Sequence, residues 1–131
     1  MGVRRKARIL AFQAIYSWEV NNESIDSLLE FSWKKEEQSE EVINFAKLLA
    51  VGTVENISYI DESIKKNIRN WDFDRLSKVD LAILRTAIFE IVFQEDVPVG
   101  VSINEAIEIA KSFGTDDSYK FINGVLDNIK E

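Results

Sequence analysis

The sequence predicts an all-α fold with six to seven helices in a single domain over residues 1–131. One proline and five glycines leave room for long helices and make a many-turned β fold unfavourable. Apolar residues recur at spacings of three or four along most of the chain, as they do on the buried face of a helix. The nearest approach to a strand is the short alternating stretch 97–103, VPVGVSI.

The first predicted helix, 4–18, reads RRKARILAFQAIYSW and has a cationic start and an apolar remainder. A helix that is apolar on nearly all sides is buried, because no face suits water. Cations at a helix N-terminus oppose the macrodipole by a few tenths to roughly 1 kcal/mol each. Since stability does not explain the basic cluster, which consists of Arg4, Arg5, Lys6 and Arg8, it is a candidate ligand site.

Two further helices are predicted before residue 71. Ser24 caps a short one, and residues 34–41 form a solvated connection. Ser39 then caps a long amphipathic helix that ends near Asn70. Within it, Gly52 costs roughly 1 kcal/mol relative to alanine. We interpret this glycine as a site of close approach by another helix, for which the first helix is the candidate.

A second central helix follows a short connector at 71–76, WDFDRL, which has room for one helical turn. Ser77 and Asp80 fit a capping box at its start, and it ends before Pro98, because the residue before a proline disfavours the α region.

Two helices complete the chain. Ser102 and Glu105 fit a second capping box, which predicts that a helix opens there. Gly114 is a suitable C-terminal stop for it, and one of the three residues 115–117 caps the last helix.

Composition excludes several function classes. Cysteine and histidine are absent, which removes disulfide scaffolds, thiolate metal sites and the commonest general base. The chain carries no glycine-rich phosphate loop and no nucleophile elbow. We therefore predict no catalytic residue, no metal and no cofactor, and a protein that is not an enzyme.

The sequence also predicts a cytoplasmic protein without membrane spans. The apolar stretch near Ala82 contains Arg85 and Glu90, so it does not suit a bilayer. Gln13 interrupts the apolar run behind the basic start, which argues against an export signal.

The basic cluster has two interpretations, which we weight equally. A net charge of −7 is unlike that of a non-specific polyanion binder, so the cations could serve solubility alone. Alternatively they contact phosphates, for which the planar donor fork of arginine is suited. Four such contacts would give single-stranded RNA binding a log–log salt slope of roughly −3.

Aromatic residues offer base stacking as a second kind of contact. By residue type alone, core packing is the favoured role for Tyr16 and for Phe121, which lies one position off the inward stripe of the last helix. Trp18, Trp33 and Trp71 are predicted to be core or helix-junction residues rather than ligand platforms.

Four segments together resemble the NusB transcription antitermination family. They are RRKARILAFQAIYSW at 4–18, LLAVGTVENISYID at 48–61, RLSKVDLAILRTAIFE at 75–90 and INEAIEIAKSFGTDDSYKFINGVLD at 103–127. The resemblance covers nearly the whole chain, and residues 21–41 are its least specific part.

The resemblance implies two three-helix bundles packed around a central N-terminal helix. It also implies binding of boxA RNA in ribosomal RNA leaders, together with the ribosomal protein NusE, within an RNA polymerase antitermination complex. The positions that match the family's RNA contacts are Arg4, Arg5, Lys6, Arg8, Gln13, Tyr16, Asp117, Ser118 and Phe121. The implied partner surface lies on the helix matching 77–95, with Asp80 and Arg85 as members.

Three other readings compete. One is a helical adaptor that binds protein only, with the basic end facing an acidic patch. Another is the similar RNA-binding module at the front of some ribosomal-RNA cytosine methyltransferases, whose catalytic domain would not fit into 131 residues. The third is an uncharacterised helical enzyme. Some family members self-associate, so a homodimer that covers the arginine-rich face and blocks RNA is a further possibility.

Overall fold

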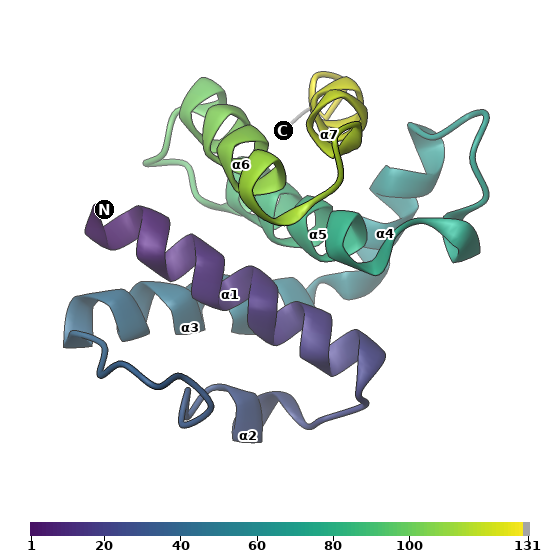
Figure 1. Ribbon diagram of the computed structural model, residues 1–131. Coiled ribbons are helices and arrows are strands. Elements are labelled where there is room, and N and C mark those ends of the chain that lie inside the picture. Colours follow the sequence, from purple (N-terminus) through teal and green to yellow (C-terminus); the bar gives the residue numbers. More distant parts are fainter. Residues whose placement is uncertain (130–131) are drawn as a thin grey trace.

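A computed structural model describes residues 1–129, and within that range the chain is helical throughout, with seven α-helices and no strand (Figure 1). The elements in order are α1 (Val3–Val20), α2 (Ile25–Leu28), α3 (Glu40–Glu55), α4 (Ile57–Lys66), the 3-10 turn η1 (Phe73–Arg75), α5 (Lys78–Phe93), α6 (Val99–Phe113) and α7 (Ser118–Leu126). The predicted all-α class and helix number are confirmed.

Helix α1 is apolar on nearly all sides because it packs in two directions. One side, with Ala7, Leu10 and Ala14, joins a small cluster with α2 and α3. The other side, with Phe12 and Ile15, joins the main cluster formed with α3 to α7. Figure 1 shows the purple α1 lying between α3 on one side and α5 and α6 on the other. The expected central place of the first helix is thus observed.

Helix α5 is the most buried element. Every residue from Asp80 to Ile91 is buried, and the helix packs against α1, α3, α4, α6 and α7. Its sequence explains this, because only three charged residues interrupt the run from Asp80 to Glu90, and each of the three is buried. Two of these residues form ion pairs with other helices. Arg85 pairs with Asp61 of α4, and Glu90 pairs with Arg8 of α1.

Three predicted helix caps are confirmed. The hydroxyls of Ser24, Ser39 and Ser77 accept hydrogen bonds from the backbone N–H three residues on, at 3.1, 3.3 and 3.3 Å. Each such cap satisfies one of the N–H groups that a helix start leaves unpaired. Gly114 ends α6 as expected, and η1 supplies the helical turn expected in the connector.

The single long helix predicted up to Asn70 is wrong, because the chain breaks at Asn56 into α3 and α4. The Asn56 side chain donates to the Gly52 carbonyl at 2.8 Å, and its backbone leaves the helical region at φ −115° and ψ 21°. Asparagine readily makes such local bonds in place of helical ones. The apolar spacing continues across the break, which is why periodicity did not reveal it.

The second capping box is also wrong. Helix α6 begins at Val99, directly after Pro98, so Ser102 lies inside the helix. Proline has a fixed φ angle suited to a helix start, and Pro98 as the N-cap residue makes no side-chain cap bond. The Ser102 hydroxyl donates instead to the Glu90 carboxylate of α5 at 2.7 Å. The serine and glutamate of the pattern are therefore used for contacts between helices.

Gly52 does allow close approach, but by α5 and not by α1. A Cβ built at Gly52 would lie 2.1 Å from the ring of Phe89, which is itself buried. Trp71 lies at a helix junction as predicted, but 63% of it is exposed, so a core role for it is wrong. No helix within residues 1–129 combines the length and the apolar character that a membrane span requires.

Candidate nucleic-acid interface

The basic cluster occupies the first two turns of α1, but its four members differ in exposure. Arg4 and Lys6 are exposed, Arg5 is partly exposed, and Arg8 is buried at 7%. The first turn of α1 contains no acid, and its N-cap residue Gly2 offers no side-chain bond. The local charge at this helix end is therefore balanced only by acids from other elements.

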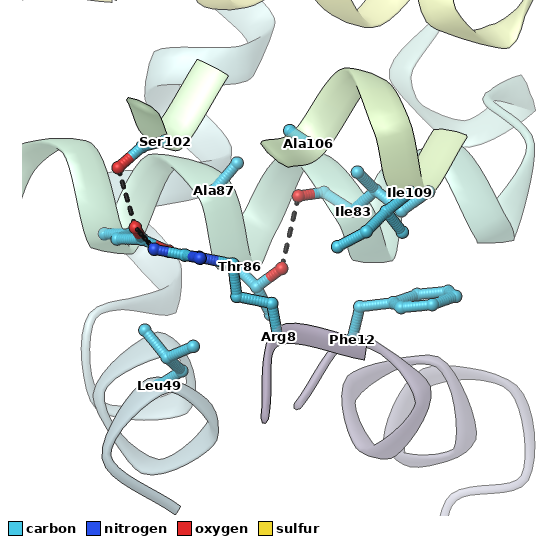
Figure 2. A pocket seen from close by; sticks show the side chains of 10 residues that line it. Arg8, Phe12, Leu49, Ile83, Thr86, Ala87, Ser102, Ala106 and Ile109 are labelled. Carbon is cyan, nitrogen blue, oxygen red and sulfur yellow. Dashed lines mark hydrogen bonds and ion pairs between the residues drawn. The ribbon is translucent and has the colours of Figure 1, made fainter. Parts of the chain in front are cut away.

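Arg8 is fully engaged in ion pairs inside the protein. Its Nε and Nη2 donate to the two carboxylate oxygens of Glu90 at 2.9 and 2.7 Å, and its Nη1 donates to Glu105 at 3.3 Å. Figure 2 shows Arg8 beneath Ser102, whose hydroxyl donates to the same Glu90 carboxylate. The cavity beside them measures about 20 Å³, close to the minimum for one water molecule. A phosphate contact by Arg8 stays a prediction, and it would require this network to open.

Arg5 forms a second two-point ion pair, with Glu105 of α6, at 3.1 and 2.7 Å. The hydrogen bonds from Arg5 lower the pKa of the Glu105 carboxyl against the opposing effect of burial, and Arg8 adds to the lowering. The pKa of the Arg5 guanidinium is raised in turn by the same partner. Glu105 thus orients the start of α1 and still leaves part of Arg5 at the surface.

Arg4, at the same helix end, contacts other residues than Arg5 and Arg8 do at their carboxylates. Its guanidinium lies 3.6 Å from the carboxylate of Asp96, and both side chains are more than half exposed. It also lies over the ring of Phe45 from α3, 4.6 Å from the centroid, which is within cation–π range. Such exposed pairs are weak and exchange readily with solvent or a ligand.

Gln13 and Tyr16 follow on α1 and are both half-buried. Tyr16 packs against the main core, as its residue type suggested. The Gln13 Oε1 atom is buried and accepts no hydrogen bond from residues 1–129, which is unusual for a polar atom inside a protein. RNA contact by either residue remains a prediction.

The remaining predicted RNA contacts gather at the start of α7. Asp117, Ser118 and Phe121 line one hollow of about 290 Å³. Asp80 of α5, which the resemblance assigned to the partner surface, lines the same hollow. The structure therefore joins one predicted partner residue to three predicted RNA residues. The Ser118 hydroxyl accepts a hydrogen bond from the Thr115 N–H at 2.9 Å, which fixes the turn before α7.

An aromatic pair, the exposed Trp71 and the half-buried Phe121, lines this hollow. The rings of Trp71 and Phe121 meet edge to face with centroids 5.4 Å apart. On the other side of the pair lies a second hollow of about 560 Å³, whose lining includes Lys66, Arg69 and Lys120. Sequence reasoning missed these three cations and the exposure of Trp71. A tryptophan among the polar residues of WDFDRL was the available signal.

Arg85, the second residue assigned to the partner surface, lies apart from Asp80's hollow. It donates two hydrogen bonds to Asp61 at 2.9 Å each and one to Glu19 at 2.7 Å. Burial lowers the pKa of its guanidinium, but the bonds to Asp61 and Glu19 outweigh burial and raise it overall. Arg85 is only 4% exposed, so in this structure it ties α5 to α1 and α4.

Comparison with known proteins identifies the relatives of this arrangement. The model of the NusB family matches residues 5–131. The chain belongs to the NusB family. It is 50% identical over 129 residues to the transcription antitermination protein NusB of Treponema denticola, across 97% of this chain and 95% of that one.

Solved NusB structures share the fold. One from T. maritima is 39% identical, with a TM-score of 0.88, across 96% of this chain and 89% of that one. A structure of the antitermination factors NusB and NusE in complex with dsRNA matches at 29% identity and a TM-score of 0.88, across 98% of this chain and 96% of that chain. The NusB family match includes both hollows and three of the four basic-cluster residues.

Proposed function

We propose that this protein is a transcription antitermination factor that binds boxA RNA of ribosomal RNA leaders together with NusE, as part of an RNA polymerase complex. The observation that carries the proposal is the start of α1, where cations stay at the surface of an otherwise acidic protein. The solved relative with NusE and dsRNA supports RNA and NusE as the partners.

The exposure of the four cations supports phosphate contact by three of them. Arg4, Arg5 and Lys6 are at least partly exposed, whereas Arg8 is held by Glu90. Each phosphate contact contributes about −0.7 to the log–log salt slope of single-stranded RNA binding. Three contacts from the basic cluster would contribute a slope of about −2, and an opened Arg8 network would move it toward −3.

The acidic net charge of −7 fits a shared binding surface. A basic ribosomal protein would complement acidic patches elsewhere on this chain and would supply part of the attraction for RNA. The proposal therefore predicts that NusE strengthens RNA binding. Because the partner would supply part of the attraction for RNA, a cluster of cations at one end of α1 would be enough on this chain.

The test is a titration of a boxA-containing RNA and a scrambled RNA of equal length against the protein, alone and with NusE. Arg5→Ala and Phe121→Ala are measured alongside Lys47→Ala, which removes an exposed cation on α3 that lines neither hollow. We expect selective binding that NusE strengthens and that both site variants weaken, with Lys47→Ala unchanged.

Equal weak binding to both RNAs, insensitive to NusE and to the substitutions, would contradict the proposal. Tight NusE binding without RNA binding would instead favour the protein-only adaptor. Light scattering of the same samples measures the mass of the protein particles and so distinguishes a monomer from a homodimer. A homodimer that dissociates when RNA is added would show that self-association covers the basic cluster.

A further inference from the structure

A row of alternating charges runs from the interior of the protein to the start of α1. Glu90 of α5 is buried and accepts two hydrogen bonds from Arg8, at 2.9 and 2.7 Å. Arg8 donates its remaining nitrogen, Nη1, to Glu105 of α6 at 3.3 Å. Glu105 in turn accepts two hydrogen bonds from Arg5, at 3.1 and 2.7 Å. The exposure of the side chains rises along this row, and Arg5, at 43%, is the member that reaches the surface.

The Arg5 pair leaves one edge of the guanidinium free. A guanidinium is planar and carries five N–H groups, one on Nε and two on each Nη. Within residues 1–129, the side-chain hydrogen bonds of Arg5 use only Nε and Nη2, which form one edge of the plane. One N–H of Nη1 and the second N–H of Nη2 form the next edge, and these two N–H groups are parallel. Such an edge can bind two oxygens of one phosphate.

Glu105 rests on a fixed support. Its inner partner, Arg8, is 7% exposed and is bound at two points by Glu90. The Ser102 hydroxyl donates to the same Glu90 carboxylate at 2.7 Å (Figure 2). The bonds from Arg5 also lower the pKa of the Glu105 carboxyl, so that it is ionised at neutral pH. This carboxylate therefore fixes the direction in which Arg5 extends.

We propose that Glu105 is a positioning residue for RNA, which holds Arg5 so that the free edge of its guanidinium is available to one phosphate. Glu105 is not among the positions that match the family's RNA contacts, and it carries the same sign of charge as RNA. The inference rests on the proposed function and deepens it, because it adds a residue that acts on RNA only through Arg5.

Two opposing effects set the sign of this contribution to RNA affinity. A mobile arginine loses rotamer freedom when it binds, which weakens binding by about two- to twelvefold for one long side chain. An arginine already held by a carboxylate has lost that freedom beforehand. Against this, the Glu105 charge repels a phosphate across the width of the guanidinium, by about threefold in water and by less than about twofold with screening at physiological salt. Orientation therefore outweighs repulsion under these conditions.

The test is a titration of the boxA-containing RNA at about 0.15 M salt, alone and with NusE. Glu105→Gln keeps the size of the side chain but leaves one acceptor oxygen for the two N–H groups of Arg5. We expect it to weaken RNA binding by about fivefold, because the preorganisation of Arg5 is lost.

Glu108→Gln is the matched control on the same helix. The charge of Glu108 raises the pKa of the Arg5 guanidinium, but the ion pair of Glu108 is with Lys111, at 3.4 Å. This variant removes the same charge near Arg5 without removing a hydrogen bond to it. RNA binding should be unchanged or tighter by up to about twofold, opposite in sign to Glu105→Gln.

A double-mutant cycle with Arg5→Ala separates positioning from stability. Without the Arg5 side chain, Glu105→Gln should change RNA affinity by less than about twofold, because nothing is left to orient. The salt dependence gives a second readout. Arg5→Ala should flatten the log–log slope by about 0.7, the value of one phosphate contact, whereas Glu105→Gln should leave the slope unchanged because the contact still forms. Thermal unfolding of each variant checks that the fold is retained.

Two results would overturn the inference. Glu105→Gln could bind RNA as tightly as the wild type or more tightly, which would make Glu105 a shield of Arg5. Alternatively, its effect could be equally large in the Arg5→Ala background, which would assign Glu105 to the stability of the fold alone. In either case RNA binding by the wild-type protein, and with it the proposed function, would stand. Absence of any RNA binding by the wild type would overturn both proposals together.

Discussion

Arg8 and Glu90 stand 82 positions apart in the chain and form a two-point ion pair, with N–O distances of 2.9 and 2.7 Å, that is almost completely buried. The pair joins the first helix to the end of the most buried one. Ser102 and Glu105 complete it from a third helix. A residue that the sequence places in a basic cluster thus serves to hold three helices together.

Replacing Arg8 by alanine should lower the free energy of unfolding by about 3–5 kcal/mol, because it leaves Glu90 buried without its counter-charge. Urea unfolding followed by circular dichroism measures the change. Lys6→Ala, an exposed cation of the same cluster, is the control and should stay within about 0.5 kcal/mol of the wild type.

The double variant Arg8→Met with Glu90→Leu separates charge from packing. Apolar replacements of a buried ion pair are often neutral or stabilising. We expect it to recover most of the stability that Arg8→Ala loses. If Arg8→Ala alone unfolds like the wild type, the pair does not carry the stability that its burial implies.

Acid should weaken the contact between α1 and α6. The pKa of Glu105 is lowered in the folded protein from an ordinary 4.5, so its contribution to stability is complete above about 4.5. It is lost as the pH falls through the lower folded-state value. Unfolding measured from neutral pH down to pH 3 should therefore show a falling free energy that is shallower in Glu105→Gln. Equal slopes in the two proteins would contradict the shift.

Asp80 should behave in the opposite way. Its pKa is raised from an ordinary 3.8, so ionisation costs stability at neutral pH, and the cost disappears as the pH falls below that ordinary value. Asp80→Asn should consequently be at least as stable as the wild type at pH 7, with a higher melting temperature. A markedly lower melting temperature would mean that the carboxylate has partners beyond those described.

A methyl group at residue 52 should destabilise the protein. Gly52→Ala drives a Cβ into the buried Phe89 ring, an overpacking that costs about 1–3 kcal/mol and outweighs the gain in helix propensity. Gly124→Ala is the matched control, because nothing lies within 4 Å of its added Cβ. That variant should gain up to about 1 kcal/mol. Chemical unfolding of both variants measures the difference, and stabilisation by Gly52→Ala would contradict the predicted overpacking.

The sequence predicted those elements whose signals are local. Ser24, Ser39 and Ser77 were recognised because a cap uses only neighbours in the chain. The central helices were recognised because they are apolar all round. The Ser102 pattern misled, because the hydroxyl was needed by a carboxylate on another helix. Asn56 escaped notice because apolar spacing continues on both sides of it.

In the candidate site, too, local features could be predicted from the sequence and contacts between distant residues could not. The basic cluster could be read directly, yet which arginine is free depends on Glu90 and Glu105, and their position is a property of the fold. Trp71 illustrates the converse case, since tryptophan is usually buried and only the polar residues around it in WDFDRL indicate that this one is 63% exposed. Its meeting with Phe121, fifty positions on, is set by how α7 packs on α5.

The double-sided packing of α1 has a consequence for how the protein is made. Helix α1 ends at Val20, but α5, which covers much of one side, begins only at Lys78. At synthesis rates of about 5–20 residues per second, the first helix waits several seconds on the ribosome with apolar surface uncovered. Its cations then lie on a nascent chain beside ribosomal RNA. We expect α1 to remain a client of ribosome-associated chaperones until α5 emerges, so that the burial of α1 is completed late although this helix is synthesised first.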